Sequence, residues 1–139
     1  MEKIKKLKKK FKEFNLDGYL IPKNDEFFNE YVPCEKDRLK YITNFTGSFG
    51  IAIILIKKNY LFVDGRYTLQ AKIQSGKDFK IFTIPKFYPS KVFKNKKMNI
   101  GFDPKLHTNI NLKNIFKNTN LKLTPISENL IDKLMPVNS

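Results

Sequence analysis

The first hydrophobic pattern in the chain is helical. Apolar residues recur at steps of three, four and three, with lysines between them, at Ile4, Leu7, Phe11 and Phe14. This spacing predicts an amphipathic helix over residues 4–14. Such a helix packs on a protein core or lies on a membrane surface. We favour the core, because Asn15, Asp17 and Gly18 end the helix and an apolar strand is predicted directly after it.

The next strong pattern is a continuous apolar run at residues 51–56, bounded by turn residues. A run of this length predicts a central strand that is buried on both faces. Residues 57–59 predict a hairpin turn, and residues 60–63 predict the returning strand. A helix is expected over residues 66–75, with Gly76 at its end.

The remaining elements are shorter. We expect a glycine-rich turn at residues 45–50, a loop marked by Pro85 and Pro89, strands at 18–21, 79–84, 99–102 and 121–123, and helices at 35–43, 110–116 and 130–135. Helices and strands interleave, which predicts an α/β fold with a mixed sheet. A length of 139 residues without a linker or an internal repeat predicts one domain over residues 1–139.

The formal net charge of +14 raises two hypotheses. A basic chain can bind nucleic acid or an anionic membrane. However, all but two of its 27 basic residues, Arg38 and Arg66, are lysines, and Asn and Ile are also abundant. That composition is typical of an AT-rich genome, and the lysines are spread along the chain without a known nucleic-acid motif. We therefore favour solvated surface lysines over a nucleic-acid-binding module.

Two further features of the sequence predict the cellular compartment of the protein. Cys34 is the only cysteine, which fits a reducing compartment. The basic N-terminus has no signal-peptide apolar run, and no stretch reaches the length of a membrane span. The expected location is the cytoplasm.

The sequence contains no set of residues for catalysis or metal binding. His107 is the only histidine, and motifs such as HExxH, CxxC, GxSxG or a P-loop are missing. We expect no catalytic residue and no metal ligand in this chain. His107 is predicted to be an exposed polar residue in a loop, and Cys34 a partly buried small side chain.

Arg66 is the candidate binding residue. It follows the turn residues Asp64 and Gly65, between a predicted strand and a predicted helix. Ligands of α/β folds often bind at strand ends, and the guanidinium group is a planar fork of donors. An ion pair with Asp64 explains the residue equally well. Arg38 is expected to clamp the loop at 45–50 or its own helix.

Several other side chains could line a cleft. Tyr31, Phe45 and Tyr67 are large aromatics near strands, where most such residues belong to the core. Glu30 could bind a peptide amine or be a solvated loop carboxylate.

Five segments, in this order and spacing, resemble the N-terminal region of aminopeptidase P. They are YLIP with NEYVPC (19–22 and 29–34), RLKYITNFTGSFG (38–50), VDGRYTLQA (63–71), IGFDP (100–104), and PI with ENLID (125–126 and 128–132). The match extends from about residue 17 to residue 135. Two positions depart from the family pattern, since Asn44 stands in place of glycine and Phe49 in place of alanine.

The resemblance implies the creatinase/prolidase N-terminal domain fold, a mixed sheet flanked by helices. It also implies a longer protein, an Xaa-Pro aminopeptidase, whose separate "pita-bread" domain is absent from this chain. That domain would hold two divalent metal ions, usually manganese, and remove the first residue from peptides with proline second. The chain alone would then be inactive, and a homodimer is expected.

In this family the arginine of the Asp-Gly-Arg motif contacts the bound peptide. The resemblance therefore assigns substrate binding to Arg66 and gives the domain the role of a wall that shapes peptide access. Two other functions remain open, namely a stand-alone basic nucleic-acid-binding module and a non-catalytic dimerisation or scaffold domain.

Overall fold

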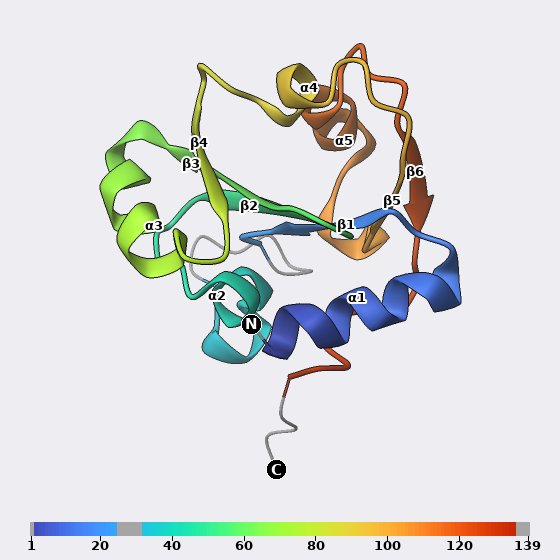
Figure 1. Cartoon of the computed structure of the whole chain (residues 1–139), viewed down its shortest axis with the longest axis horizontal. Helices are drawn as coiled ribbons and strands as arrows, with labels where there is room; N and C mark the ends of the chain where they lie inside the picture. The colour runs from blue at the N-terminus through green and yellow to red at the C-terminus, as the bar shows by residue number, and fades with distance from the viewer. Residues whose placement is uncertain (1, 25–31, 136–139) are drawn as a thin grey trace.

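The computed structural model describes residues 2–24 and 32–135. It is built around one six-stranded sheet with helices on both faces (Figure 1). The strands are β1 (Gly18–Pro22), β2 (Gly50–Leu55), β3 (Asn59–Asp64), β4 (Lys80–Ile84), β5 (Asn99–Phe102) and β6 (Lys122–Pro125). The α-helices are α1 (Glu2–Phe14), α2 (Arg38–Thr43), α3 (Thr68–Ser75), α4 (Pro89–Val92) and α5 (Asn109–Ile115). Short 3₁₀ helices are formed by η1 (Cys34–Lys36), η2 (Gly65–Tyr67) and η3 (Pro104–Leu106).

The sheet is mixed, as the sequence predicts. Its strand order is β4-β3-β2-β1-β5-β6. β2 is antiparallel to both of its neighbours, and the other pairs are parallel. The five strands other than β2 therefore share one direction, and their carboxyl ends meet at the same edge of the sheet. The continuous apolar sequence of β2 follows from its place inside the sheet, with helices over both faces.

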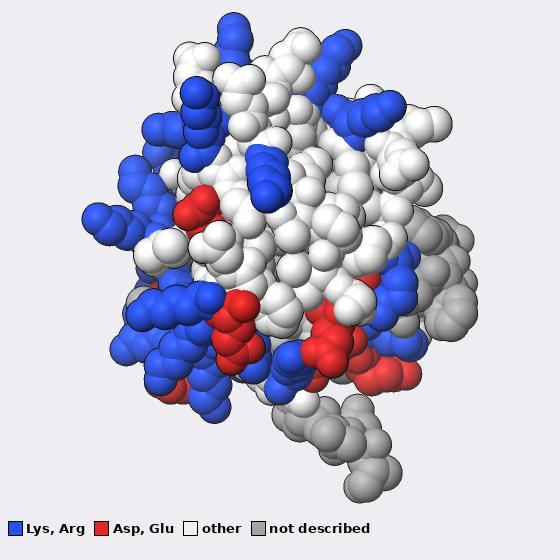
Figure 2. Space-filling model, turned by 90° about the vertical axis from the view of Figure 1, so that its right-hand side faces the viewer, with Lys and Arg blue, Asp and Glu red and all other residues white. Residues whose placement is uncertain are grey.

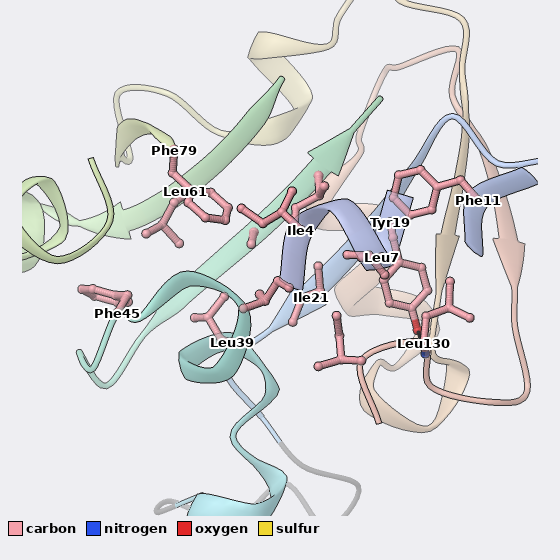
Figure 3. Packing of buried hydrophobic residues seen from close by; sticks show 14 of the residues in the cluster. Ile4, Leu7, Phe11, Tyr19, Ile21, Leu39, Phe45, Leu61, Phe79 and Leu130 are labelled. Carbon is pink, nitrogen blue, oxygen red and sulfur yellow. Dashed lines mark hydrogen bonds between the residues drawn. The ribbon is translucent and has the colours of Figure 1, made fainter. Parts of the chain in front are cut away.

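Helix α1 docks on the sheet and buries the face that its spacing predicts. Ile4, Leu7 and Phe11 are each at most 3% exposed and contact the inner residues of the sheet (Figure 3). The helix ends at Asn15, whose φ of 56° is left-handed. The backbone N–H of Leu16 donates to the carbonyl of Phe11 at 2.9 Å, which closes a Schellman-type end. The membrane-surface alternative is not needed, since the apolar face is already covered.

Two hydrophobic cores lie on opposite faces of the sheet. The larger core lies between the sheet and α1, α2, α3 and the C-terminal segment. The second core lies under α4 and α5 and is rich in aromatic rings. In it, Phe62 stacks on Phe82 with ring centroids 5.3 Å apart, and Phe93 packs edge-on against Tyr60 at 5.5 Å.

Four predicted elements differ from the structure. The helix predicted at 66–75 begins as the 3₁₀ helix η2 and continues as α3. The helix predicted at 35–43 is divided into η1 and α2, because the side chain of Asp37 accepts a hydrogen bond from the N–H of Lys40 and starts a new helix there. The loop predicted around Pro85 and Pro89 contains the short helix α4, with Pro89 in its first turn.

The last of these differences is near the C-terminus. The predicted helix at 130–135 is a series of turns. Side chains satisfy part of its backbone: the side-chain oxygen of Asn129 accepts from the N–H groups of Ile131 and Asp132, and the Tyr41 hydroxyl donates to the carbonyl of Leu134 at 2.8 Å. The N–H groups of Leu134 and Met135 donate to the carbonyl of Ile131. Local hydrogen bonds of this kind compete with helix formation.

Candidate functional site

The Asp-Gly-Arg motif at 64–66 and the turn at 45–50 lie together at the carboxyl edge of the sheet. β3 ends at Asp64, directly before η2, and β2 begins at Gly50, directly after the turn at 45–50. Gly50 pairs with Val63 in the register of these strands, so the two segments are neighbours. This is the edge at which open α/β sheets bind ligands.

Arg66 lies in η2, immediately beyond the end of β3. Asp64 fixes the turn, since its carboxylate accepts a hydrogen bond from the backbone N–H of Arg66 at 2.9 Å. The same carboxylate oxygen lies 3.3 Å from Arg66 Nε. These two hydrogen bonds, the backbone one foremost, lower the pKa of Asp64.

The Arg66 side chain points into solvent and is 75% exposed. Its guanidinium lies over the ring of Tyr67, 5.3 Å from the centroid. The predicted ion pair with Asp64 is present, but it uses only Nε. Within the described part of the chain the two terminal nitrogens have no partner, so they are available to carbonyl or carboxylate oxygens of another molecule.

The turn at 45–50 packs beside Arg66. Phe45 is fully buried, and its ring meets Tyr67 edge-on with centroids 5.9 Å apart. The Tyr67 hydroxyl contacts Ser48 Oγ at 2.5 Å. Phe45 is thus a core residue as expected, while Tyr67 is half-buried and joins η2 to the turn.

Two glutamines, which the sequence interpretation missed, attach this turn to α3. Gln70 and Gln74 both donate to Thr46 Oγ1, at 2.8 and 2.9 Å. The N–H of Thr46 donates to Gln74 Oε1 at 3.0 Å. Their spacing of four residues on a predicted helix places them on one face, but only the structure shows which loop that face meets.

The two departures from the family pattern fit this geometry. Asn44 ends α2 with a φ of 66°, and asparagine tolerates this left-handed conformation better than most non-glycine residues. Phe49 is 43% exposed, so its larger side chain points out of the turn.

Arg38 is a structural clamp, but its partner differs from the two that were expected. The buried guanidinium, 4% exposed, donates from Nε and a terminal nitrogen to the two carboxylate oxygens of Asp132, at 2.7 and 3.0 Å. It therefore holds the C-terminal segment against α2. The prediction failed because a contact across 94 residues leaves no local pattern.

His107 and Cys34 also differ from their predicted environments. His107 is buried, with 9% exposed, and its ring packs edge-on against Phe102 with centroids 6.1 Å apart. Its Nδ1 lies 2.8 Å from Asn111 Oδ1, its Nε2 has no hydrogen-bond partner, and burial lowers the pKa of the ring. Cys34 is exposed rather than partly buried, since it begins the surface turn η1.

His107 does not lie in one site with Arg66. β5, which leads to His107, is separated from β3 by β2 and β1. Among residues 2–24 and 32–135, no three His, Cys, Asp or Glu side chains are close enough together to hold a metal ion. Glu30 and Tyr31 lie outside the described residues.

The structure also bears on the membrane and nucleic-acid hypotheses. In the described ranges, no helix combines the length and apolarity needed to cross a bilayer. Figure 2 shows one face of the molecule, on which the lysines lie mostly around the margin of a broad uncharged area. This face therefore offers no continuous basic groove for a phosphate backbone.

Comparison with known proteins now adds to the geometry. The family model described as the Creatinase/Prolidase N-terminal domain matches residues 3–134. The chain belongs to the creatinase/prolidase N-terminal domain family. The resemblance and the fold class predicted from the sequence are thereby confirmed.

Relatives of this family extend the match. Xaa-Pro aminopeptidase 1 of Dictyostelium discoideum is 31% identical over 96% of this chain and 23% of its own length. Xaa-Pro aminopeptidase 2 of Mus musculus is 30% identical over 91% of this chain and 20% of its own length. The chain thus spans under a quarter of these two curated relatives.

Solved structures share the fold. The X-prolyl aminopeptidase of Caenorhabditis elegans, described as a cytosolic enzyme with a di-nuclear active site, has a TM-score of 0.83 at 27% identity, over 95% of this chain and 25% of that one. The N-terminal domain of peptidase PepQ from Mycobacterium tuberculosis has a TM-score of 0.71 at 20% identity, over 96% of this chain and 98% of that one. The second match shows the fold alone.

Proposed function

We propose that this chain is the N-terminal domain of an Xaa-Pro aminopeptidase, whose remaining part hydrolyses the bond before a proline at the second position. The support is the run of relatives with that name, each matched over nearly all of this chain and under a quarter of its own length. The C. elegans neighbour is described as cytosolic, which agrees with the proposed cytoplasmic location.

The metal ions of such an enzyme belong to the remaining part of the protein. The described residues do not fit a di-nuclear centre, because they offer no group of three or more metal-ligating side chains. We propose two divalent ions there, with manganese as the candidate. We propose that this chain binds and orients the peptide while the remaining part supplies the hydrolytic step.

Arg66 carries this proposal. Its side chain is 75% exposed at the carboxyl edge of the sheet, and Asp64 fixes its turn by accepting a hydrogen bond from its backbone N–H. The terminal nitrogens can donate to a peptide carbonyl or carboxylate as the peptide lies between the two parts of the protein. The turn at 45–50 stands beside it as a rigid wall that limits the length of the segment before the proline.

The experiment is steady-state kinetics of the full-length enzyme on an Xaa-Pro-Xaa peptide. We expect Arg66→Ala to lower kcat/KM by about tenfold to a hundredfold, since a hydrogen bond to a charged group contributes about 1.5–3 kcal/mol. Arg66→Lys retains the charge but not the fork, so it should recover only part of the loss.

Lys113→Ala is the matched control, because it removes an exposed cation from α5, on the other face of the sheet from α3. It should leave kcat/KM unchanged. If Arg66→Ala is as active as the wild type, Arg66 has no part in peptide binding.

The exposed face of α3 supports docking of the remaining part of the protein close to this site. Leu69 and Ile73, one helical turn apart, are 72% and 76% exposed. Large apolar side chains in such exposed pairs are typical of surfaces that another domain covers. The homodimer expected from the resemblance is an alternative use of the same face.

A further inference from the structure

A second candidate site lies at the opposite edge of the sheet. The β2–β3 hairpin and the segment that leads into β5 border an open cavity of about 350 Å³. Its floor is apolar, with Leu55, Phe93 and Met98 among its lining residues. The volume is within the range of about 300–1,000 Å³ that is usual for small-molecule sites.

Four lysines line this cavity. Lys57 and Lys58 come from the hairpin loop, and Lys96 and Lys97 come from the segment before β5. None of the four makes an ion pair or a side-chain hydrogen bond with residues 2–24 or 32–135. The acidic residue of the lining, Asp17, already accepts a hydrogen bond from the N–H of Asn99 at 2.7 Å.

An aromatic hydroxyl adds a directional donor. Tyr60 lines the cavity, and its ring is fixed between Phe93 and Phe82, with centroids 5.5 and 5.7 Å away. Its hydroxyl has no hydrogen-bond partner within the described part of the chain. A half-buried tyrosine of this kind combines an apolar body with a free polar end.

We propose that this cavity binds a small organic anion that has an apolar body and one carboxylate or phosphate monoester group. The floor removes the apolar body from water, which stabilises the complex in proportion to the area buried. The uncompensated lysines attract the anionic group, and the Tyr60 hydroxyl donates to it. The site is independent of the peptidase function, because it lies at the other edge of the sheet from Arg66.

The test is an NMR titration of the ¹⁵N-labelled chain with 1-naphthyl phosphate and 1-naphthoate, which separate the two anionic groups. Inorganic phosphate and 1-naphthol are the comparators, because each has only one half of the proposed chemistry. We expect amide shifts confined to residues 55–60 and 92–98, and binding of at least one naphthyl anion about tenfold or more tighter than either comparator.

Variants distinguish binding in the cavity from nonspecific attraction of anions to a basic protein. Tyr60→Phe removes only the hydroxyl, and we expect it to weaken binding several-fold. The double variant Lys96→Gln/Lys97→Gln should weaken it about tenfold, since two nearby charges are lost. Lys5→Gln/Lys9→Gln removes the same charge from the exposed side of α1 and should change nothing.

Three outcomes would overturn the proposal. Equal affinity for inorganic phosphate would mean that the lysines act as charge alone, and equal affinity for 1-naphthol would mean that only the apolar surface matters. Shifts spread over lysines throughout the chain, with the α1 control weakening binding as much as the cavity variant, would mean an adventitious electrostatic effect. The unliganded spectrum of each variant checks that it is folded.

Discussion

At the scale of single residues, Gly47 has no room for a side chain. A Cβ atom at this position would lie 2.2 Å from Cζ of the buried Phe45 ring. This ring also supports Tyr67, the neighbour of Arg66. The requirement for glycine here is therefore steric, and the φ angle plays no part, since no glycine of the described chain has a positive φ.

We predict that Gly47→Ala destabilises the chain by about 1–3 kcal/mol, because the Phe45 ring must shift within a packed core. Gly65→Ala is the control, since its added Cβ would meet Thr83 only at 3.6 Å. Thermal denaturation followed by circular dichroism should show a fall of several degrees in Tm for Gly47→Ala alone. Equal Tm values for the two variants would contradict this packing.

His107 predicts a pH dependence of stability. Burial lowers the pKa of its ring below the usual value of 6.5. The unfolded chain then takes up a proton more readily than the folded chain, so the free energy of unfolding falls as the pH drops through 6.5. The slope contributed by this one group is at most about 1.4 kcal/mol per pH unit.

The measurement is urea denaturation of the wild type and His107→Gln at pH 7.5 and pH 5.5. Glutamine can retain a hydrogen bond to Asn111 but cannot titrate. We expect the wild type to lose more stability than the variant over this interval. Parallel losses would show that His107 is not kept neutral by the fold.

At the scale of elements, the turn at 45–50 depends on α3 for its position. Gln74 both donates to Thr46 Oγ1 and accepts from the Thr46 N–H. Gln70 donates to the Thr46 hydroxyl and to Gln74 Oε1, but does not contact the Thr46 N–H. We predict that Gln74→Ala speeds hydrogen exchange at the Thr46 amide, because that N–H loses its acceptor. Gln70→Ala should leave the exchange rate near the wild-type value, and NMR-detected exchange distinguishes the two.

Stability should change little in either glutamine variant. The network is largely exposed, so water replaces the lost contacts, and a hydrogen bond contributes about 1 kcal/mol or less in this setting. A large fall in the free energy of unfolding would mean that the network supports the core as well as the turn.

The elements differ in how far the sequence predicts them. α1 and β2 were predicted from periodicity and an uninterrupted apolar run, because burial dictates those patterns directly. The C-terminal turns and the contact between Arg38 and Asp132 were not, since they depend on side chains from distant parts of the chain. The same reason explains why Gln74 was missed.

At the scale of the whole molecule, the sheet topology places Asp64, Arg66 and the turn at 45–50 together. The sequence predicts a strand-to-helix junction at Arg66 and, by resemblance, its role. It does not predict that, within the guanidinium group, Asp64 would contact Nε and leave the terminal nitrogens exposed. Strand order and side-chain direction determine this geometry, and a local sequence pattern predicts neither of them.

The α3 face makes a further prediction about the full-length protein. Leu69→Lys/Ile73→Lys should leave the stability of this chain unchanged, since both side chains are in solvent. In the full-length enzyme the same pair should lower Tm and kcat/KM, because lysines would be buried against the remaining part. Ile110→Lys on α5, where the side chain is 74% exposed, is the control.

Gel filtration of this chain distinguishes the two uses of that face. A monomer at all concentrations agrees with a surface that the rest of the protein covers. If the chain is a dimer and the double variant Leu69→Lys/Ile73→Lys is a monomer, the face binds a second copy instead.

The most direct test of the central claim is a crystal structure of the full-length enzyme with an uncleaved Xaa-Pro peptide. The account predicts a terminal nitrogen of Arg66 within about 2.7–3.2 Å of a peptide oxygen, with the turn at 45–50 beside the peptide. An Arg66 side chain turned away from the peptide, or a peptide bound at another edge of this sheet, would contradict it.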